Sequence, residues 1–257
     1  MDLSAERYIR TPGIRVRHTS ETVSTNTDIM RLAADGEAEG LLLIAERQTA
    51  GRGRRGRSFY SPDGGLYMSM LLRPVSAAED VMLLTPMAAV AVAEAVDALC
   101  GTDTRIKWVN DILSNGKKIC GILTEAVFGE RSVPEAVALG IGLNLIAPRD
   151  GFPCEICDIA GAVFSDACPD ETLPARLIAE IWDRFFAYYR EPAHMSFRET
   201  YRKKQALTGK EVSVIRPGDT RNAVVLGVDE RCGLIVRYPD GFEETLTSGE
   251  VSVRKNP

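Results

Sequence analysis

The chain has 257 residues, of which 45% are apolar and 26% are charged, a composition ordinary for a globular protein and too apolar for a disordered one. Its 31 basic and 36 acidic residues give a net charge of −5, so any phosphate or nucleic-acid site must be local. The six cysteines are scattered, and there is neither a signal-peptide core nor an uninterrupted apolar run of about 18 residues. We therefore expect a cytoplasmic protein without a membrane span or a disulfide framework.

The predicted elements indicate a mixed α+β domain, a β-sheet packed with helices, over residues 23–207, after a polar, aperiodic N-terminal arm at 1–22. Capping residues and apolar spacing predict helices at 25–34, 85–100 and 173–189, the second beginning at Thr85-Pro86. Apolar runs predict strands at 41–45, 66–72, 106–113, 118–127 and 136–146. Asn115-Gly116, between the third and fourth of these strands, predicts a tight hairpin turn.

The pattern changes after Leu207, where short strand-like runs alternate with turn residues such as Pro217-Gly218-Asp219 and Ser248-Gly249. The runs lie at 211–216, 222–228, 234–238, 242–247 and 250–254. They predict a small β-barrel domain at residues 208–257, which is too small to be very stable alone and should pack on the larger domain.

Residues 51–57, GRGRRGR, hereafter the arginine loop, place four arginines and three glycines in seven positions of an acidic chain. Glycines let a backbone wrap closely around a ligand, and arginine guanidinium groups match carboxylates and phosphates. The loop is therefore a candidate anion-binding segment that an anion would order. Its charge alone fits a solvated basic loop or a nucleic-acid patch equally well.

The segment KWVND at 107–111 precedes the predicted hairpin turn, and Lys117-Lys118 follows it. Because the two strands of a hairpin are neighbours, we expect amines, an amide and a carboxylate to lie close together. A lysine ammonium there would stabilise a carboxylate and a phosphate electrostatically, and Asp111 could hold a divalent cation on phosphates. An exposed hairpin with ordinary surface charges is the alternative.

Two further motifs carry weaker signals. Gly140 and Gly142, within the apolar run GIGLN at 140–144, permit the close approach of a ligand or a neighbouring strand. Cys154 and Cys157 have the spacing of a metal or redox pair, but the chain has no second cysteine pair of this kind and only two histidines. We therefore expect no metal site there.

Taken together, the motifs resemble those of the biotin protein ligases, over residues 21–145. The resemblance is carried by Ser24-Thr25-Asn26, by Gln48-Thr49-Ala50 leading into the arginine loop, and by the segments at 107–111, 117–123 and 140–144. It implies a biotin/lipoyl ligase-like catalytic domain followed by an SH3-like barrel. Only about 20 residues precede the motifs, too few for a DNA-binding winged helix. The short form of the family, a biotin–[acetyl-CoA-carboxylase] ligase without repressor activity, is therefore expected.

The resemblance also implies a reaction. ATP and biotin, with Mg²⁺, would give biotinyl-5′-AMP and pyrophosphate, and the biotinyl group would then pass to one lysine of a biotin carboxyl carrier protein. No DNA or membrane partner is expected, and homodimer formation is left open.

The resemblance assigns roles to individual residues. Biotin would contact Ser24, Thr25, Asn26, Gln48, Gly51, Arg52, Lys118, Gly140 and Gly142. The nucleotide would contact Arg54, Arg55, Arg57, Phe59, Lys107, Asn110, Asp111 and Asn144. Arg52 and Lys118 would be catalytic, and Asp111 would hold Mg²⁺ through the phosphates. Val109 stands where the family usually has proline.

Three other hypotheses remain at this point. A lipoate or octanoate ligase or transferase would share the catalytic fold but lacks this arginine loop. A nucleic-acid-binding protein would use the loop as a basic patch, against which the acidic net charge argues. A biotin sensor would bind the vitamin without ligating it.

Overall fold

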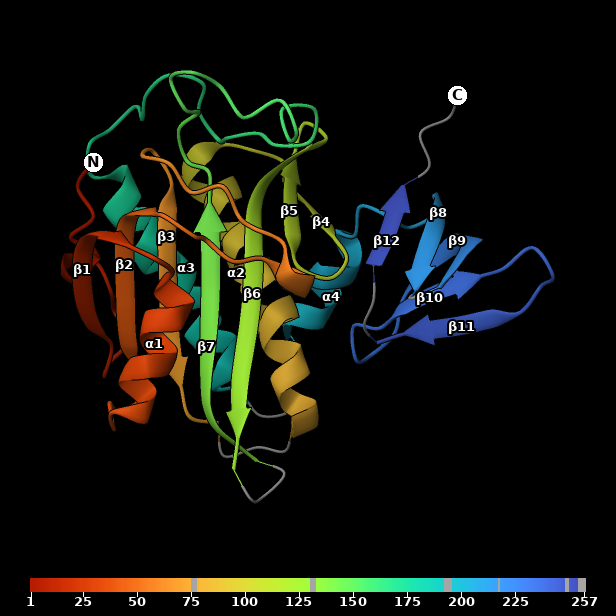
Figure 1. The fold of residues 1–257 in the computed structure, drawn as a ribbon, viewed down its shortest axis with the longest axis horizontal. Helices are drawn as coiled ribbons and strands as arrows, with labels where there is room; N and C mark the ends of the chain where they lie inside the picture. The colour runs from red at the N-terminus through yellow and green to blue at the C-terminus, as the bar shows by residue number, and fades with distance from the viewer. Residues whose placement is uncertain (75–77, 130–132, 192–195, 217, 248–249, 254–257) are drawn as a thin grey trace.

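The computed structural model describes residues 1–74, 78–129, 133–191, 196–216, 218–247 and 250–253, which form two separate sheets (Figure 1). The larger sheet has seven strands in the order β1-β2-β3-β7-β6-β5-β4, and the smaller has five in the order β11-β10-β9-β8-β12. In the larger sheet β1 and β2 are parallel and all other neighbours are antiparallel. The predicted α+β class, a mixed sheet followed by a small antiparallel β domain, is confirmed.

The bounds of the elements follow the chain. The helices are α1 (Thr25–Ala34), α2 (Ala78–Cys100), α3 (Leu173–Tyr189) and α4 (Ser196–Lys203), with 3₁₀ turns at Ala5–Arg7 and Arg54–Gly56. The strands of the larger sheet are β1 (Arg15–Thr22), β2 (Leu41–Gln48), β3 (Leu66–Leu72), β4 (Arg105–Lys107), β5 (Asp111–Ser114), β6 (Lys117–Phe128) and β7 (Pro134–Leu143). Those of the smaller sheet are β8 (Glu211–Arg216), β9 (Asp219–Val228), β10 (Leu234–Arg237), β11 (Glu243–Leu246) and β12 (Glu250–Val253).

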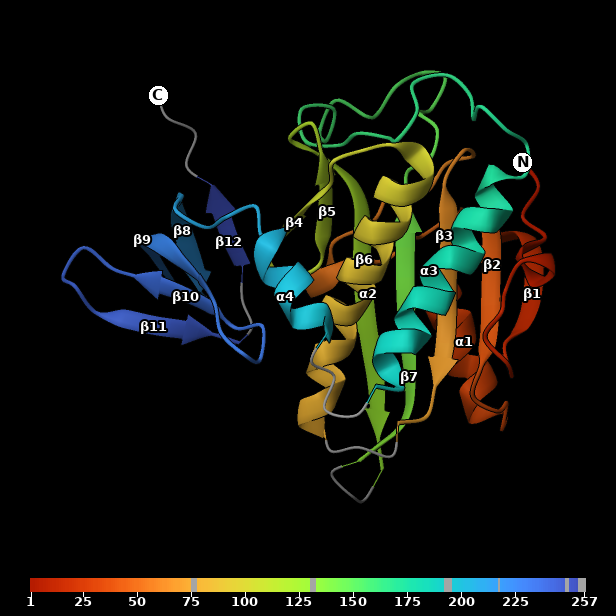
Figure 2. The same ribbon diagram turned by 180° about the vertical axis from the view of Figure 1, so that it is seen from behind.

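Helices cover both faces of the larger sheet. Helix α1 lies on one face, in front of β3 and β7 in Figure 1, and α2 and α3 lie on the opposite face, which Figure 2 shows. The alanine-rich part of α2, residues 88–93, is buried on every side, because small side chains let the helix approach the sheet and α3 closely. Trp182 and Phe185 of α3 fill the space behind β3 and are fully buried. Burial of each large apolar side chain of this kind contributes about 2 kcal/mol.

Helix α2 begins at Ala78, one and a half to two turns before the predicted start at Thr85-Pro86, so Pro86 lies inside the helix. Proline removes a backbone donor and usually ends a helix. Here Val81, Leu83 and Leu84 are buried in the core before the proline, and this packing extends the helix in spite of the missing hydrogen bond. Residues 81–100 are also long and apolar enough to cross a membrane, but 67% of the most apolar 18-residue stretch of this segment is buried inside the fold.

The prediction of an aperiodic arm at residues 1–22 was wrong for its second half. Residues 15–22 form β1, an edge strand that pairs with β2, with Arg15 opposite Leu41. Most side chains of β1 are exposed, which explains why its sequence lacks an apolar pattern. Its pairing comes from backbone hydrogen bonds, and Arg15 and Arg17 both form ion pairs with Glu37.

The predicted strand at 106–113 is divided into β4 and β5 by a tight turn at residues 108–110, so KWVND does not lie on one strand. Lys107 and Asp111 consequently face each other across the antiparallel pair. Trp108 lies in this turn with its side chain buried. Its backbone N–H donates to Gln205 Oε1 at 3.0 Å, and its indole N–H donates to the Cys232 carbonyl at 2.9 Å. The turn is therefore anchored to the C-terminal domain.

The predicted hairpin turn at Asn115-Gly116 is confirmed. Both residues have positive φ, 49° and 76°, as the right-handed twist of a two-residue hairpin requires. The five strand-like runs of the C-terminal domain also become β8 to β12. Of the turns expected between them, those involving Pro217 and Ser248-Gly249 fall outside the described residues.

Candidate functional site

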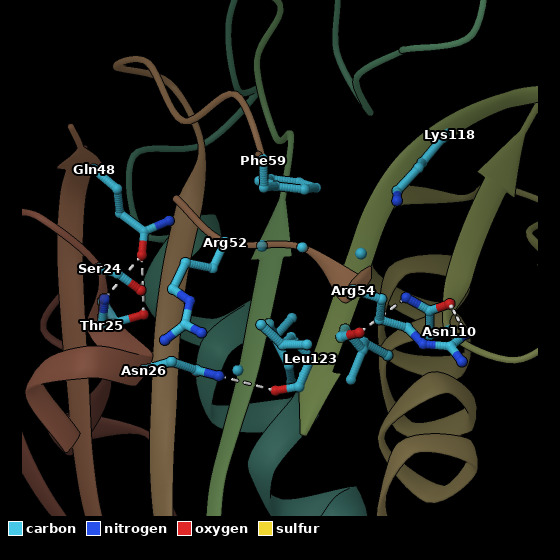
Figure 3. Close-up of a pocket in the computed structure, with 16 residues that line it drawn as sticks. Ser24, Thr25, Asn26, Gln48, Arg52, Arg54, Phe59, Asn110, Lys118 and Leu123 are labelled. Atoms are coloured by element: carbon cyan, nitrogen blue, oxygen red, sulfur yellow. Dashed lines mark hydrogen bonds between the residues drawn. The ribbon is translucent and has the colours of Figure 1, made fainter. Parts of the chain in front are cut away.

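A pocket lies on the face of the larger sheet that also carries α1, over strands β6 and β7 (Figure 3). Its walls come from the start of α1, the end of β2, the arginine loop, the turn at residues 108–110 and the two strands. The lining residues are Ser24, Thr25, Asn26, Gln48, Arg52, Gly53, Arg54, Phe59, Asn110, Lys118, Gly121, Ile122, Leu123, Gly140, Ile141 and Gly142. Segments almost 120 residues apart in the sequence thus meet at one place.

Three glycines form the floor of the pocket. Gly121 of β6 lies opposite Gly142 of β7, and Gly140 is two residues before Gly142 on the same face. A methyl group at Gly140 would stand 2.1 Å from Asn26 Oδ1, and one at Gly142 would stand 2.6 Å from the ring of Phe59. The glycines therefore allow the amide of Asn26 and the ring of Phe59 to lie directly on the sheet.

Gln48 holds the start of α1 at the pocket. Its Oε1 accepts a hydrogen bond from the backbone N–H of Thr25 at 2.9 Å, and its Nε2 donates to Ser61 Oγ at 2.9 Å. Ser24, the residue before the helix, makes no capping bond with its own side chain. Gln48 at the end of β2 thus satisfies a donor of the first helical turn that a local cap would otherwise take.

The side chain of Asn26 is fixed on both sides. Its Oδ1 lies 2.6 Å from the hydroxyl of Ser69, which donates to it. Its Nδ2 donates to the Leu123 carbonyl at 3.1 Å and to Glu125 Oε2 at 2.9 Å. Because both partners of Nδ2 are acceptors, the amide has one orientation.

Sequence reasoning missed two polar residues that hold the Asn26 side chain, Ser69 and Glu125. Ser69 is fully buried, and its signal was available: it is the one polar residue in the apolar run LYMSMLL of β3. Glu125 follows the motif at 117–123, at the point where β6 becomes more exposed, and it had no comparable local signal.

The arginine loop forms a small hairpin that closes over the pocket. Residues Arg52 and Ser58 form an antiparallel bridge, and the Gly53 N–H donates to the Arg57 carbonyl at 2.7 Å. The side chain of Arg52 points into the pocket toward Asn26, as Figure 3 shows, and its Nη2 lies 2.9 Å from Glu125 Oε1. The loop thus places one guanidinium group over the floor of the pocket.

Lys118 lies on the other side of the pocket from Gln48, and Phe59 lies between them (Figure 3). The Lys118 ammonium is 2.6 Å from Asp111 Oδ1 and 5.6 Å from the centre of the Phe59 ring. Its side chain is 30% exposed, so the charge is partly shielded from water. Two residues further along β6, burial in the core raises the pKa of the Cys120 thiol, so this group stays neutral.

A second pocket of about 140 Å³ continues from the first and shares the ring of Phe59 and the side chain of Lys118. Between the two, Arg54 Nη1 donates to Asn110 Oδ1 at 3.2 Å, and Asn110 Nδ2 donates to the Ile122 carbonyl at 2.9 Å. The other charged residues around the second pocket are Arg55, Arg57, Lys107 and Asp111, and Val251 of β12 adds an apolar contact from the C-terminal domain. This pocket gathers all the residues that the resemblance assigned to a nucleotide except Asn144.

Two predicted site residues do not line either pocket. Asn144 is buried, and its Nδ2 donates to the Gly161 carbonyl at 2.9 Å, so it anchors the segment that follows β7. Gly51 lies just outside, where a methyl group would stand 2.4 Å from the Phe59 carbonyl. Its contribution is therefore to let the two ends of the arginine loop approach each other.

Among the residues that line the two pockets, Asp111 has the one carboxylate that could hold a metal ion. Among the residues that the structure describes, no group of three or more His, Cys, Asp or Glu side chains could form a protein cage. A single carboxylate fits Mg²⁺ that is held mostly by phosphate oxygens and water.

Cys154 and Cys157 are both exposed, and the Cys157 thiol donates to the Cys154 carbonyl at 3.2 Å.

Comparison with known proteins identifies the family of the chain. Residues 18–144 match the model of the Biotin/lipoate A/B protein ligase family, and residues 207–254 match that of the Biotin protein ligase C terminal domain. The biotin–[acetyl-CoA-carboxylase] ligase of Paracoccus denitrificans is 32% identical over 240 residues, which cover 90% of this chain and 98% of that protein. The bifunctional ligase/repressor BirA of Bacillus spizizenii is 43% identical over 229 residues, covering 88% of this chain and 70% of that protein.

Solved structures show the same arrangement of both domains. The biotin protein ligase from Aquifex aeolicus, in complex with biotin and ATP, superposes with a TM-score of 0.75 at 27% identity, covering 94% of this chain and 99% of that one. Both family models and a relative matched over nearly its whole length point to one group of ligases. The chain belongs to the biotin protein ligase family.

Proposed function

We propose that this protein activates biotin with ATP and transfers it to a lysine of a biotin carboxyl carrier protein. In the first step a biotin carboxylate oxygen attacks the α-phosphorus of ATP, the bond to the β-phosphate breaks, and biotinyl-5′-AMP and pyrophosphate form. In the second step the neutral amine of the acceptor lysine attacks the acyl carbon, loses a proton and releases AMP. The observation that carries this proposal is a pair of cations, Arg52 and Lys118, that both line the first pocket, while Lys118 also lines the adjoining second pocket.

The pair matters because the first step joins two anions. A carboxylate and a triphosphate repel each other, and cations fixed between them lower that repulsion most in a partly dry pocket. Arg52 enters from the arginine loop and Lys118 from β6, from opposite sides of the pocket. We assign Arg52 and Lys118 as catalytic residues that hold the reacting carboxylate and phosphate.

The first pocket suits biotin. Its glycine floor keeps Asn26 and Phe59 low on the sheet and so leaves room above them for the fused rings of biotin, and the polar groups of Ser24, Thr25 and Gln48 along one wall suit the ureido group. In this assignment Asn26, Gly140 and Gly142 form the contact surface. The second pocket, with its arginines, would take the nucleotide, and the ring of Phe59 between the two would stack on adenine.

Magnesium would be held by Asp111 together with phosphate oxygens, where it would neutralise phosphate charge. Lys118 already contacts this carboxylate at 2.6 Å, so the ammonium and the cation would share it. From the sequence we also propose a biotin carboxyl carrier protein as the partner, no DNA partner and a cytoplasmic location.

The test is biotin-dependent exchange of labelled pyrophosphate into ATP, with lipoate and octanoate as parallel substrates. Exchange with biotin alone is the expected result. Exchange with lipoate or octanoate instead would assign the chain to another activity of the same fold. The absence of exchange with every acid, together with tight biotin binding, would leave only a biotin sensor. Transfer to a purified carrier domain, followed by mass spectrometry of the modified lysine, then tests the second step.

A further inference from the structure

One acidic side chain that contacts two residues of the first pocket has no role in the assignments above. Glu125 lies on β6, on the same face of the sheet as Gly121 and Leu123, and it pairs across the sheet with Ala138. Its side chain is 24% exposed, which is low for a charged group. An unneutralised carboxylate at this place would repel the anionic substrates of the proposed reaction, so its presence calls for an explanation.

The contacts of Glu125 provide this explanation. Oε1 lies 2.9 Å from Arg52 Nη2, and Oε2 accepts a hydrogen bond from Asn26 Nδ2 at 2.9 Å. One carboxylate therefore holds a side chain from the arginine loop and a side chain from α1 at the same time. Each of its two oxygen atoms has one of these donors.

We propose that Glu125 is a positioning residue that fixes the guanidinium of Arg52 over the pocket floor and couples it to the amide of Asn26. A guanidinium has five N–H donors in a planar fork, so it can bind Glu125 along one edge and a substrate anion along another. The inference rests on the proposed function of the pocket, because it assigns Glu125 to the same reaction.

The physical reason for a carboxylate lies in its two acceptors. The side chain of Arg52 is 53% exposed and has several rotatable bonds, so it would otherwise occupy many conformations. Glutamine at position 125 has the same shape but only one acceptor oxygen, so it can satisfy Arg52 or Asn26 and must present an NH₂ group to the other. Asn26 keeps its bonds to Ser69 and Leu123, whereas Arg52 loses its ion pair.

The test is a double-mutant cycle measured by pyrophosphate exchange, with Glu125→Gln, Arg52→Met and the double variant. We expect Glu125→Gln to lower kcat for exchange by at least about tenfold, while the KM for biotin changes less than about threefold. In the Arg52→Met background the same substitution should have less than about a twofold effect, because Glu125 acts through the guanidinium.

Glu37→Gln is the matched control. Glu37 is 25% exposed and, like Glu125, its two oxygens bind two donors, Arg15 at 3.0 Å and Arg17 at 3.3 Å, but it lies outside both pockets. It should leave exchange unchanged while affecting thermal stability as much as Glu125→Gln. If Glu125→Gln does not fold, Glu125→Asp replaces it. Aspartate keeps the charge but is too short to reach both donors, so the same fall in kcat is expected.

An unchanged kcat in the folded variant would overturn the inference, as would an equal effect in the Arg52→Met background. Wild-type exchange is the separate test of the proposed function. If the wild type shows none, the coupling of Glu125 to Arg52 is measured by the same cycle on the free energy of unfolding. Glu125→Gln should then cost less stability in the Arg52→Met background than in the wild type, and an equal cost would overturn the inference.

Discussion

Lys118 provides the sharpest test of the proposed chemistry. In the structure its ammonium lies between Asp111 and the ring of Phe59, at the junction of the two pockets. A unit charge about 4 Å from a developing negative charge contributes about 4 kcal/mol at an effective dielectric of about 20, as an upper limit. The side chain is 30% exposed, and its removal also leaves the Asp111 carboxylate without this partner.

For Lys118→Ala we therefore expect the barrier of adenylate formation to rise by about 3 kcal/mol, which lowers the exchange rate more than a hundredfold. The wall with Gln48 and the glycine floor are untouched, so the dissociation constant of biotin should change less than about fivefold. The rate is measured by pyrophosphate exchange and the affinity by calorimetry.

Lys117→Ala is the control, because the neighbouring ammonium points away and donates to the Cys157 carbonyl at 3.2 Å. It should retain exchange to within about threefold. Equal losses of binding and adenylation in Lys118→Ala would refute the catalytic assignment, and so would an equally large loss in Lys117→Ala.

Three further substitutions or modifications test the packing. Gly140→Ala would place a methyl group 2.1 Å from Asn26 Oδ1, so it should destabilise the fold by about 1–3 kcal/mol and weaken biotin binding. An unchanged melting temperature and an unchanged biotin affinity would contradict the close contact of Asn26 with Gly140. Trp108→Phe removes the indole donor to the Cys232 carbonyl and should cost about 1–2 kcal/mol in urea unfolding; no loss would mean that this bond does not anchor the turn. Burial raises the pKa of the Cys232 thiol to about 12, so at pH 8 its reactive thiolate is scarce, and iodoacetamide should label exposed Cys154 first. Equal labelling rates of Cys232 and Cys154 at pH 8, followed by peptide mass spectrometry, would contradict the burial of Cys232.

Local sequence signals were sufficient where neighbouring residues decide the conformation. The hairpin at Asn115-Gly116 follows from two adjacent residues that tolerate positive φ, and the end of α2 follows from Gly101 after an apolar run. The arginine loop is contiguous, so its charge and its glycines could be recognised before any contact was known. The resemblance that these motifs carried also indicated the family.

Only the tertiary structure decided the features that depend on distant residues. Glu125 meets Asn26 from a position 99 residues along the chain, and the pairing of β1 with β2 uses backbone groups that leave no apolar pattern. The helix continues through Pro86 because core packing outweighs a local preference. Side-chain hydrogen bonds and ion pairs across a sheet depend on the register of the strands and on the face of the sheet to which each side chain points. Neither property can be predicted from the contacting residues alone, because both are set by the pairing of strands that are distant in the sequence.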